Sequence, residues 1–202
     1  ATYGLWSYTE TSGVGSWVAL HSISPALLLR ADIDGNGLID TIADFTGYGV
    51  WAYMNNTSWT RLHYLDAVDL KAGDIDGNGQ SDLVIQFASY GVWMYLNNTT
   101  WSQLHPWQAN GIVVANIDND GGHRSDVILN LPGAGVWVYK NNTSWTQLHP
   151  LNPTVMAATD FDGNGRDDVA MAFAGYGIYI WQNDTSWTGL HPYVPALMAG
   201  GR

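Results

Sequence analysis

The chain has 202 residues, a formal net charge of −11, and no cysteine. This length suits one domain with a sizeable core, and the absence of cysteine excludes disulfides and thiolate metal sites. The seven Lys and Arg residues are scattered, which excludes the basic footprint of a nucleic-acid-binding protein. No apolar run approaches the length of a membrane span, so we expect no insertion into a membrane.

The composition favours strands and turns. Eleven Trp, eleven Tyr and 23 Gly accompany a single glutamate, Glu10, whereas helices favour Glu and disfavour Gly. The other 17 acidic residues are all Asp, and 13 of them lie in four short loops. The residues after Ala1 contain neither the charged nor the apolar region of a signal peptide, so we expect a mature, processed chain.

The first repeated feature along the chain is the loop D-I-D-G-N-G-L-I-D at residues 32–40. It returns at 74–82 and 160–168, with a looser copy at 116–126, and the loops start 42, 42 and 44 residues apart. A period of this length indicates a propeller, a solenoid or an array. Calcium binds hard oxygen ligands. The three closely matching loops each offer carboxylates at positions one, three and nine, an amide at position five and a backbone carbonyl at position seven. The loops therefore predict calcium sites.

The second repeated feature is the segment G-V-W-A-Y-M-N-N-T-S-W-T-R-L-H at residues 49–63. Its copies are 91–105, 135–149 and 177–191, with a divergent copy, longer at its turn, at 4–21. Apolar, β-branched and aromatic residues predict four short strands per period, in the first period at about 26–31, 40–45, 50–54 and 59–63. No connection is long enough for a crossover helix, so the strands are expected to be antiparallel.

We therefore predict an all-β fold: one β-propeller domain, residues 1–202, of four-stranded antiparallel blades with about 42 residues per repeat. The repeats run over about 22–63, 64–105, 106–149 and 150–191. Residues 1–21 correspond to third and fourth strands, and residues 192–202 align with the first strand near 25–32. Five blades, with the last one closed by both termini, would leave no exposed strand edge. The alternative is a fragment of a larger ring.

The Asp loop, its following apolar strand, Phe45 and the Gly-Tyr-Gly-Val-Trp segment at 47–51 resemble the FG-GAP/VCBS repeat. That repeat builds the integrin α-chain head, some fungal and bacterial lectin propellers and many bacterial surface and secreted proteins. The resemblance covers essentially the whole chain. It implies a propeller, Ca²⁺ in the blade loops, and binding or adhesion by a secreted or cell-surface protein.

The resemblance also implies which residues bind the metal, the backbone carbonyl acting at position seven. In the three regular loops these are Asp32, Asp34, Asn36, Leu38 and Asp40; Asp74, Asp76, Asn78, Gln80 and Asp82; and Asp160, Asp162, Asn164, Arg166 and Asp168. The loop at 116–126 departs from the pattern, because it begins with Asn and has two extra residues around Gly122 and His123. Its candidate ligands are Asn116, Asp118, Asp120 and Asp126.

The alternative for these loops is a set of Asp-capped turns without metal. Three carboxylates held close together would repel one another without a cation, which favours metal binding. The loops are not EF-hands, because position twelve is Ala43, Ile85 or Met171 where an EF-hand has a bidentate Glu.

Recurring aromatic and polar residues outside the loops are candidate ligand contacts. A sugar can stack its C–H face on an aromatic ring, and the fourth-strand Trp59, Trp101, Trp145 and Trp187 lie beside Asn-rich turns that could bind hydroxyls. Packing between blades is the alternative for each of them. The third-strand Trp51, Trp93 and Trp137 are expected to pack between blades. The recurring histidines are expected to have a structural role, such as bonding the backbone of a neighbouring blade, and the alternative for them is a metal or sugar ligand.

Three equivalent second-strand positions, Asp44, Gln86 and Asn130, are polar among apolar neighbours and could line a channel or a ligand site. Solvent exposure at a strand end is the alternative for them. The repeated Asn-x-Thr/Ser sequences are either glycan acceptors or polar turns. They begin at Asn55, Asn56, Asn97, Asn98, Asn141, Asn142 and Asn183.

Three functions remain open at the sequence level. The first is a carbohydrate-binding propeller with several equivalent weak sites. The second is a module that binds an extracellular or cell-surface protein. The third is a glycosidase, which we do not expect, because the carboxylates outside the loops share no repeat position that would pair them.

Overall fold

The computed structural model describes residues 3–118, 120–121 and 124–200, and these residues form 18 strands and no helix. The strands are β1 (Leu5–Thr11), β2 (Val14–His21), β3 (Leu27–Ala31), β4 (Asp40–Phe45), β5 (Gly49–Met54), β6 (Ser58–His63), β7 (Ala67–Gly73), β8 (Asp82–Phe87), β9 (Gly91–Leu96), β10 (Thr100–His105), β11 (Gly111–Ala115), β12 (Asp126–Leu131), β13 (Gly135–Lys140), β14 (Ser144–His149), β15 (Val155–Thr159), β16 (Asp168–Phe173), β17 (Gly177–Gln182) and β18 (Ser186–His191).

The strands form four antiparallel four-stranded sheets, which we number as blades 1 (β3–β6), 2 (β7–β10), 3 (β11–β14) and 4 (β15–β18). In each blade every strand pairs with its neighbour in sequence. The hairpin β1–β2 forms a fifth, two-stranded sheet from third- and fourth-strand material. The predicted all-β propeller is confirmed, and the five sheets fit five blades.

The blades are held together by apolar side chains between neighbouring sheets. Every residue of the second strands β4, β8, β12 and β16 is buried, and each of these strands pairs with a strand on either side within its own blade. Three apolar clusters fill the spaces between blades 1 and 2, 2 and 3, and 3 and 4. The burial of apolar surface in these three clusters supplies most of the stabilisation of the fold.

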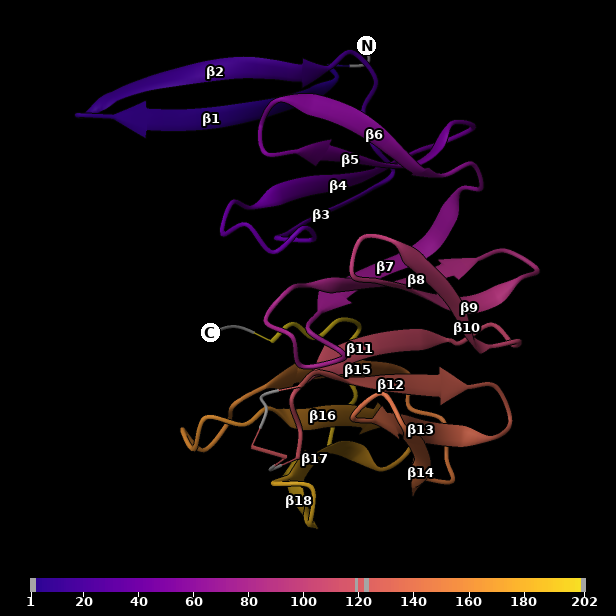
Figure 1. The fold of residues 1–202 in the computed structure, drawn as a ribbon. Helices are drawn as coiled ribbons and strands as arrows, with labels where there is room; N and C mark the ends of the chain where they lie inside the picture. The colour runs from indigo at the N-terminus through magenta and orange to yellow at the C-terminus, as the bar shows by residue number, and fades with distance from the viewer. Residues whose placement is uncertain (1–2, 119, 122–123, 201–202) are drawn as a thin grey trace.

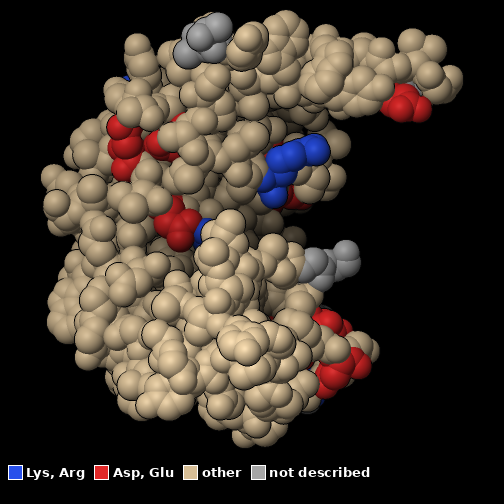
Figure 2. Space-filling view, turned by 180° about the vertical axis from the view of Figure 1, so that it is seen from behind, with Lys and Arg blue, Asp and Glu red and all other residues tan. Residues whose placement is uncertain are grey.

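The first strands lie on the inner side of the array. β3 contacts β7, β7 contacts β11, and β11 contacts β15, so the four blades follow one another around a common axis. Figure 1 shows the blades arranged in an arc, with the β1–β2 hairpin extending from one end of it. In Figure 2 the molecule is hollowed on one side, below this projecting hairpin.

The C-terminal segment differs from the prediction. Residues 192–200 form no strand, and β1–β2 stands as a two-stranded sheet. The segment instead approaches β15: a Cβ on Gly200 would lie 1.9 Å from the Ala158 carbonyl oxygen. In every complete blade the first strand pairs only with the second, and residues 1–202 contain no second strand for a fifth blade. The C-terminal segment therefore has no partner strand beside β1.

No helix in the described part of the chain is long and apolar enough to span a membrane. The two-residue insertion of the third Asp loop, Gly122 and His123, lies outside the described residues.

Candidate functional site

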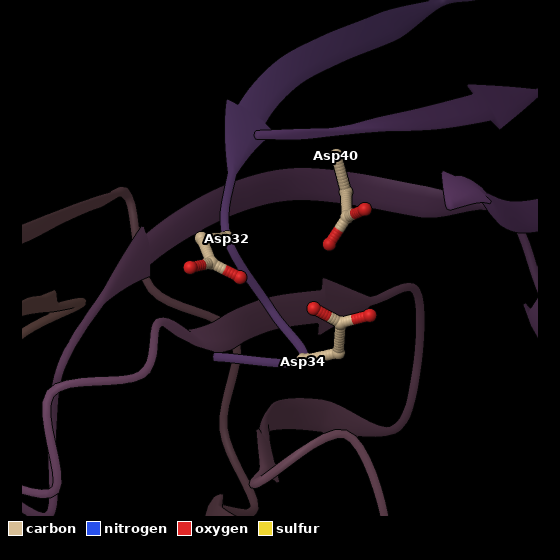
Figure 3. A group of neighbouring side chains, drawn as sticks. All are labelled: Asp32, Asp34 and Asp40. Atoms are coloured by element: carbon tan, nitrogen blue, oxygen red, sulfur yellow. The ribbon is translucent and has the colours of Figure 1, made fainter. Parts of the chain in front are cut away.

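The Asp loops join the first and second strands of each blade, and their carboxylates converge. We number them loops 1 (32–40), 2 (74–82), 3 (116–126) and 4 (160–168). In loop 1, Asp32, Asp34 and Asp40 each have an oxygen within 4.8 Å of the other two, and Figure 3 shows the three side chains around one space. The first two belong to the loop, whereas Asp40 begins β4 and is fully buried. Such a cluster of carboxylates can hold a metal ion.

Loops 2 and 4 repeat this cluster at the predicted positions. Their members are Asp74, Asp76 and Asp82, and Asp160, Asp162 and Asp168. The strand-borne aspartate is again fully buried in both loops. Burial raises the pKa of the Asp82 carboxyl from its ordinary value. In loop 4 the backbone N–H of Gly165 lowers the pKa of Asp160.

Backbone N–H groups shape each loop around its first aspartate. In loop 1, Asp32 Oδ1 accepts from Gly35 N at 2.8 Å, and its Oδ2 accepts from Gly37 N at 2.7 Å. Gly35 and Gly37 have φ of +72° and +85°, a left-handed conformation that glycine adopts without steric cost. Asn36 Oδ1 accepts from Leu38 N at 2.7 Å, so the predicted amide ligand also supports the turn. The Asp-capped turn and the carboxylate cluster thus coexist in one loop.

An asparagine that directly follows the third strand ties each hairpin to its Asp loop. Asn55 Nδ2 donates to Asp34 Oδ2 at 2.9 Å, and Asn55 N donates to Asp40 Oδ1 at 2.8 Å. The counterparts Asn97, Asn141 and Asn183 make the same two bonds in their own blades. From the sequence, these asparagines were expected to form turns, accept glycans or bind sugar hydroxyls, and their bonds to the Asp loops were not predicted. One signal in the sequence could have indicated this role. The first residue of each pair is Asn in all four blades, even where the second residue is Asp184.

Loop 3 keeps part of this geometry. Asp126 Oδ1 accepts from Asn141 N at 3.0 Å, and Asp118 Oδ2 accepts from Asn141 Nδ2 at 2.8 Å. Three buried oxygens have no hydrogen-bond partner among the described residues, namely Oδ1 of Asn116, Asp118 and Asn141. Burial raises the pKa of Asp126 to about 6. Buried oxygens without donors fit a bound cation, because a cation would satisfy them.

A second repeated site lies between the blades. The fourth-strand histidine of one sheet and the aromatic residues of the next blade line four pockets, which we name by their histidines. Their shared positions are His21, Phe45, Tyr48, Trp51 and Trp59; His63, Phe87, Tyr90, Trp93 and Trp101; His105, Leu131, Ala134, Trp137 and Trp145; and His149, Phe173, Tyr176, Tyr179 and Trp187. The His63 pocket has a volume of about 220 Å³ and the His149 pocket about 370 Å³.

The histidine of each pocket is held in one tautomer. A β-bulge in the fourth strand, between Gln103 and His105 in blade 2, changes the direction of the side chain. In the His63 pocket, His63 Nδ1 accepts from Leu65 N at 3.1 Å, so the ring proton is on Nε2. Burial lowers the pKa of both His63 and His105, which favours the neutral ring. No described residue accepts a hydrogen bond from the Nε2 of these two rings, so this N–H can donate to a ligand.

The predicted stacking residues Trp59, Trp101, Trp145 and Trp187 all lie in these pockets. The Trp101 ring lies 5.0 Å from the His63 ring and 4.7 Å from the Tyr95 ring, so it also packs within the blade interface. The third-strand Trp93 lines the same pocket, and its indole N–H donates to the Tyr90 carbonyl at 2.9 Å. Tyr90 is 53% exposed at the rim. The pockets therefore combine fixed aromatic walls with an exposed rim residue.

The polar second-strand residues do not line a channel, and they are not solvent-exposed. Asp44, Gln86 and Asn130 are 1%, 4% and 2% exposed. Asp44 Oδ1 accepts from Ala67 N at 2.8 Å, Gln86 Oε1 accepts from Ala109 N at 2.7 Å, and Asn130 Nδ2 donates to the Pro153 carbonyl at 2.8 Å. Each side chain thus bonds the segment that leads into the next blade. Burial raises the pKa of Asp44. The prediction that these three residues contact a ligand is therefore wrong, because their buried side chains join neighbouring blades.

Solved structures with this fold include recognition proteins. An Agrocybe aegerita lectin, solved to explain its recognition of non-reducing terminal N-acetylglucosamine, matches 93% of the chain at 19% identity and a TM-score of 0.60, over 60% of its own length. The lectin BP39L of Burkholderia pseudomallei matches 90% at 17% identity and a TM-score of 0.58, over 61% of its length. BBS1N, solved in complex with ARL6DN, matches 94% at 10% identity and a TM-score of 0.61, over 62% of its length.

These likenesses concern the fold alone, and they agree with the β-propeller that the blades form. The chain spans about 60% of the length of these three structures. No family model and no curated protein matches the sequence.

Proposed function

We propose that the protein is an extracellular carbohydrate-binding propeller that is stabilised by calcium and has no catalytic activity. The observation that carries this proposal is the pocket between blades, formed four times from the same positions. Its aromatic walls suit the apolar C–H face of a sugar, and the Nε2–H of the neutral histidine suits a sugar oxygen. Several equivalent weak sites become effective through multivalency on a glycan-covered surface.

The lectins among the structural neighbours support this reading at the level of the fold. The absence of catalysis is proposed on the placement of the carboxylates: most lie in the Asp loops, and Asp44 is buried in a blade interface. Paired carboxylates on an open sugar site are what a glycosidase needs.

Calcium is proposed as the occupant of loops 1, 2 and 4, with loop 3 as a variant site. The three-carboxylate clusters and the buried oxygens without donors in loop 3 support a cation. All of these donors are oxygens, which suit calcium better than softer metals. The bound ion would neutralise the clustered carboxylates and fix the loop that joins the first and second strands.

A glycan array, run with calcium and again with EDTA, tests the sugar proposal. We expect binding to a defined glycan, followed by isothermal titration with that glycan to count the sites. The His105 pocket has Ala134 at the position that Tyr48, Tyr90 and Tyr176 occupy in the other three pockets. When these three tyrosines are replaced by Ala, we expect the affinity for the glycan to fall at least about tenfold, because the stacking is lost. The matched control is Tyr3→Ala: Tyr3 has the same repeat position, next to Gly4, but lies outside the four pockets.

A protein-binding module is the second candidate. The structural neighbour BBS1N was solved with a protein partner, and the β1–β2 hairpin exposes Trp6, Tyr8 and Trp17 by 50%, 52% and 66%. Exposed aromatic clusters of this kind mark interaction surfaces. An array without any bound glycan in either buffer would contradict the sugar proposal and favour this one.

A further inference from the structure

Neighbouring Asp loops are joined to each other by backbone hydrogen bonds. The carbonyl of the first residue in one loop accepts from the N–H of the residue before the last aspartate of the next loop. Ser81 N donates to the Asp32 carbonyl at 2.9 Å, Ser125 N to the Asp74 carbonyl at 2.6 Å, and Asp167 N to the Asn116 carbonyl at 2.7 Å. The same bond thus links loops 1 to 2, 2 to 3 and 3 to 4.

Gln80 strengthens the link between loops 1 and 2, which the structure describes completely. Its side-chain amide donates to the Ile33 carbonyl in loop 1. A Cβ at Gly35 would lie 3.3 Å from Gln80 Oε1 and 3.4 Å from Gln80 Cβ, so the side chain lies directly over the turn of loop 1. Gln80 is half-buried there, whereas Leu38, at the same position of loop 1, is 53% exposed.

The backbone of Gln80 belongs to the other loop. Gln80 N donates to Asn78 Oδ1 at 2.7 Å, and the Gln80 carbonyl is the predicted seventh-position ligand of loop 2. One residue thus has its backbone in loop 2 and its side chain on loop 1. A cation in loop 2 that fixes the backbone of Gln80 also fixes the side chain that covers Gly35. A cation that orders loop 1 in turn fixes the Gln80 side chain and thereby its backbone in loop 2. Linkage makes such an effect reciprocal.

We propose that Gln80 is a positioning residue that couples the cation sites of loops 1 and 2, so that occupation of one loop tightens binding in the other. The inference rests on the calcium proposal and extends it from separate ions to a coupled pair. Couplings carried by direct contacts of this kind are commonly about fivefold or more in affinity.

Calcium titration followed by NMR tests the coupling loop by loop. The backbone amides of Gly37, Gly79 and Gly165 bond the first aspartate of loops 1, 2 and 4, so each reports its own loop. When loop 1 is disabled by Asp32→Asn and Asp34→Asn, we expect the calcium midpoint read at Gly79 to rise at least about fivefold. The midpoint at Gly165 should stay within about twofold, because no described contact joins loop 4 to loop 1.

The coupling should disappear when the amide is removed. In Gln80→Ala, disabling loop 1 is expected to change the Gly79 midpoint by less than about twofold, and Gln80→Met, which keeps the length of the side chain, should behave alike. Leu38→Ala is the matched control at the same loop position, and it should keep the coupling. Native dispersion of the amide spectrum checks that every variant is folded.

An unchanged Gly79 midpoint after loop 1 is disabled in the wild-type background would overturn the inference. The same shift in Gln80→Ala as in the wild type would overturn it too. If no loop amide responds to calcium, the calcium proposal itself fails, and this result is distinct from calcium binding without coupling.

Discussion

At the scale of single residues, one asparagine in each blade decides how the Asp loop is held. Asn97 directly follows β9 and lies in the left-handed region at φ +54°, and its Nδ2 donates to Asp76 Oδ2 at 2.8 Å. Its Oδ1 accepts from the Asn78 side chain. The neighbouring Asn98 has φ +51°, yet its side chain makes no hydrogen bond to a described residue. Both residues adopt the left-handed conformation, but only Asn97 bonds through its side chain, so comparing them distinguishes the effect of conformation from the effect of the hydrogen bonds.

Asn97→Gly should therefore destabilise the protein, whereas Asn98→Gly should not. Glycine adopts the left-handed conformation freely, so the first change removes only the side-chain bonds, at a cost of about 1–2 kcal/mol in the free energy of unfolding. The second change should stay within about 0.5 kcal/mol. Urea denaturation of both variants measures the difference. Equal losses would contradict a bonding role for Asn97.

At the scale of strands and turns, the repeated glycine at the start of each third strand is fixed by contact with the end of the fourth strand. Gly49 has φ +81°, and a Cβ there would lie 2.3 Å from the His63 carbonyl oxygen. The same close approach recurs at Gly4, Gly91, Gly135 and Gly177. Gly47, two residues earlier, also has φ +81°, but a Cβ there would meet nothing within 4 Å.

We expect Gly49→Ala to destabilise by about 3 kcal/mol or more, because left-handed strain adds to a collision with backbone that cannot move away. Gly47→Ala should cost only the strain, about 1 kcal/mol. The two glycines have the same backbone hydrogen-bond acceptor. Gly47 N donates to Asp66 Oδ1 at 2.9 Å, and Gly49 N donates to the same oxygen at 3.0 Å. Thermal unfolding followed by circular dichroism compares the two; similar melting temperatures would refute the steric argument.

The elements could be predicted because their signals are local and repeated. The apolar, β-branched and aromatic runs and the Gly and Asn turns predicted the four strands of the first blade within about one residue of their observed bounds. The Asp32, Asp34 and Asp40 cluster was also predictable, because the ligands of one loop are close in sequence. Contacts between different blades could not be predicted in this way. Nothing local to Gln86 indicates that its amide bonds Ala109.

The same limit applies to the ends of the chain and to the pockets. Residues 192–202 align with a first strand, yet residues 192–200 form no strand, because pairing depends on a neighbouring second strand that residues 1–202 do not contain. The pockets combine His63 of one blade with Phe87 and Trp101 of the next, so their composition followed only from the blade packing. The recurrence of these residues was visible in the sequence, but their meeting point was not.

At the scale of the whole molecule, the Asp loops connect each blade to the next. Backbone bonds join the four loops in succession, and each loop also joins the first and second strands of its own blade. The strand-borne aspartates Asp40, Asp82, Asp126 and Asp168 are fully buried. Without a cation, charge repulsion and desolvation oppose the compact loop, as the raised pKa of Asp82 and Asp126 indicates.

Removal of calcium should therefore destabilise the entire array. An ion that binds only the folded state contributes about 2.7 kcal/mol per site at a hundredfold excess over its Kd. We expect EDTA to lower the melting temperature by about 10 °C or more, since 1 kcal/mol corresponds to roughly 2–4 °C in a chain of this size. Magnesium in place of calcium should restore little of the loss, because it demands a tighter octahedral site. A melting temperature unchanged by EDTA would count against calcium in all of the loops.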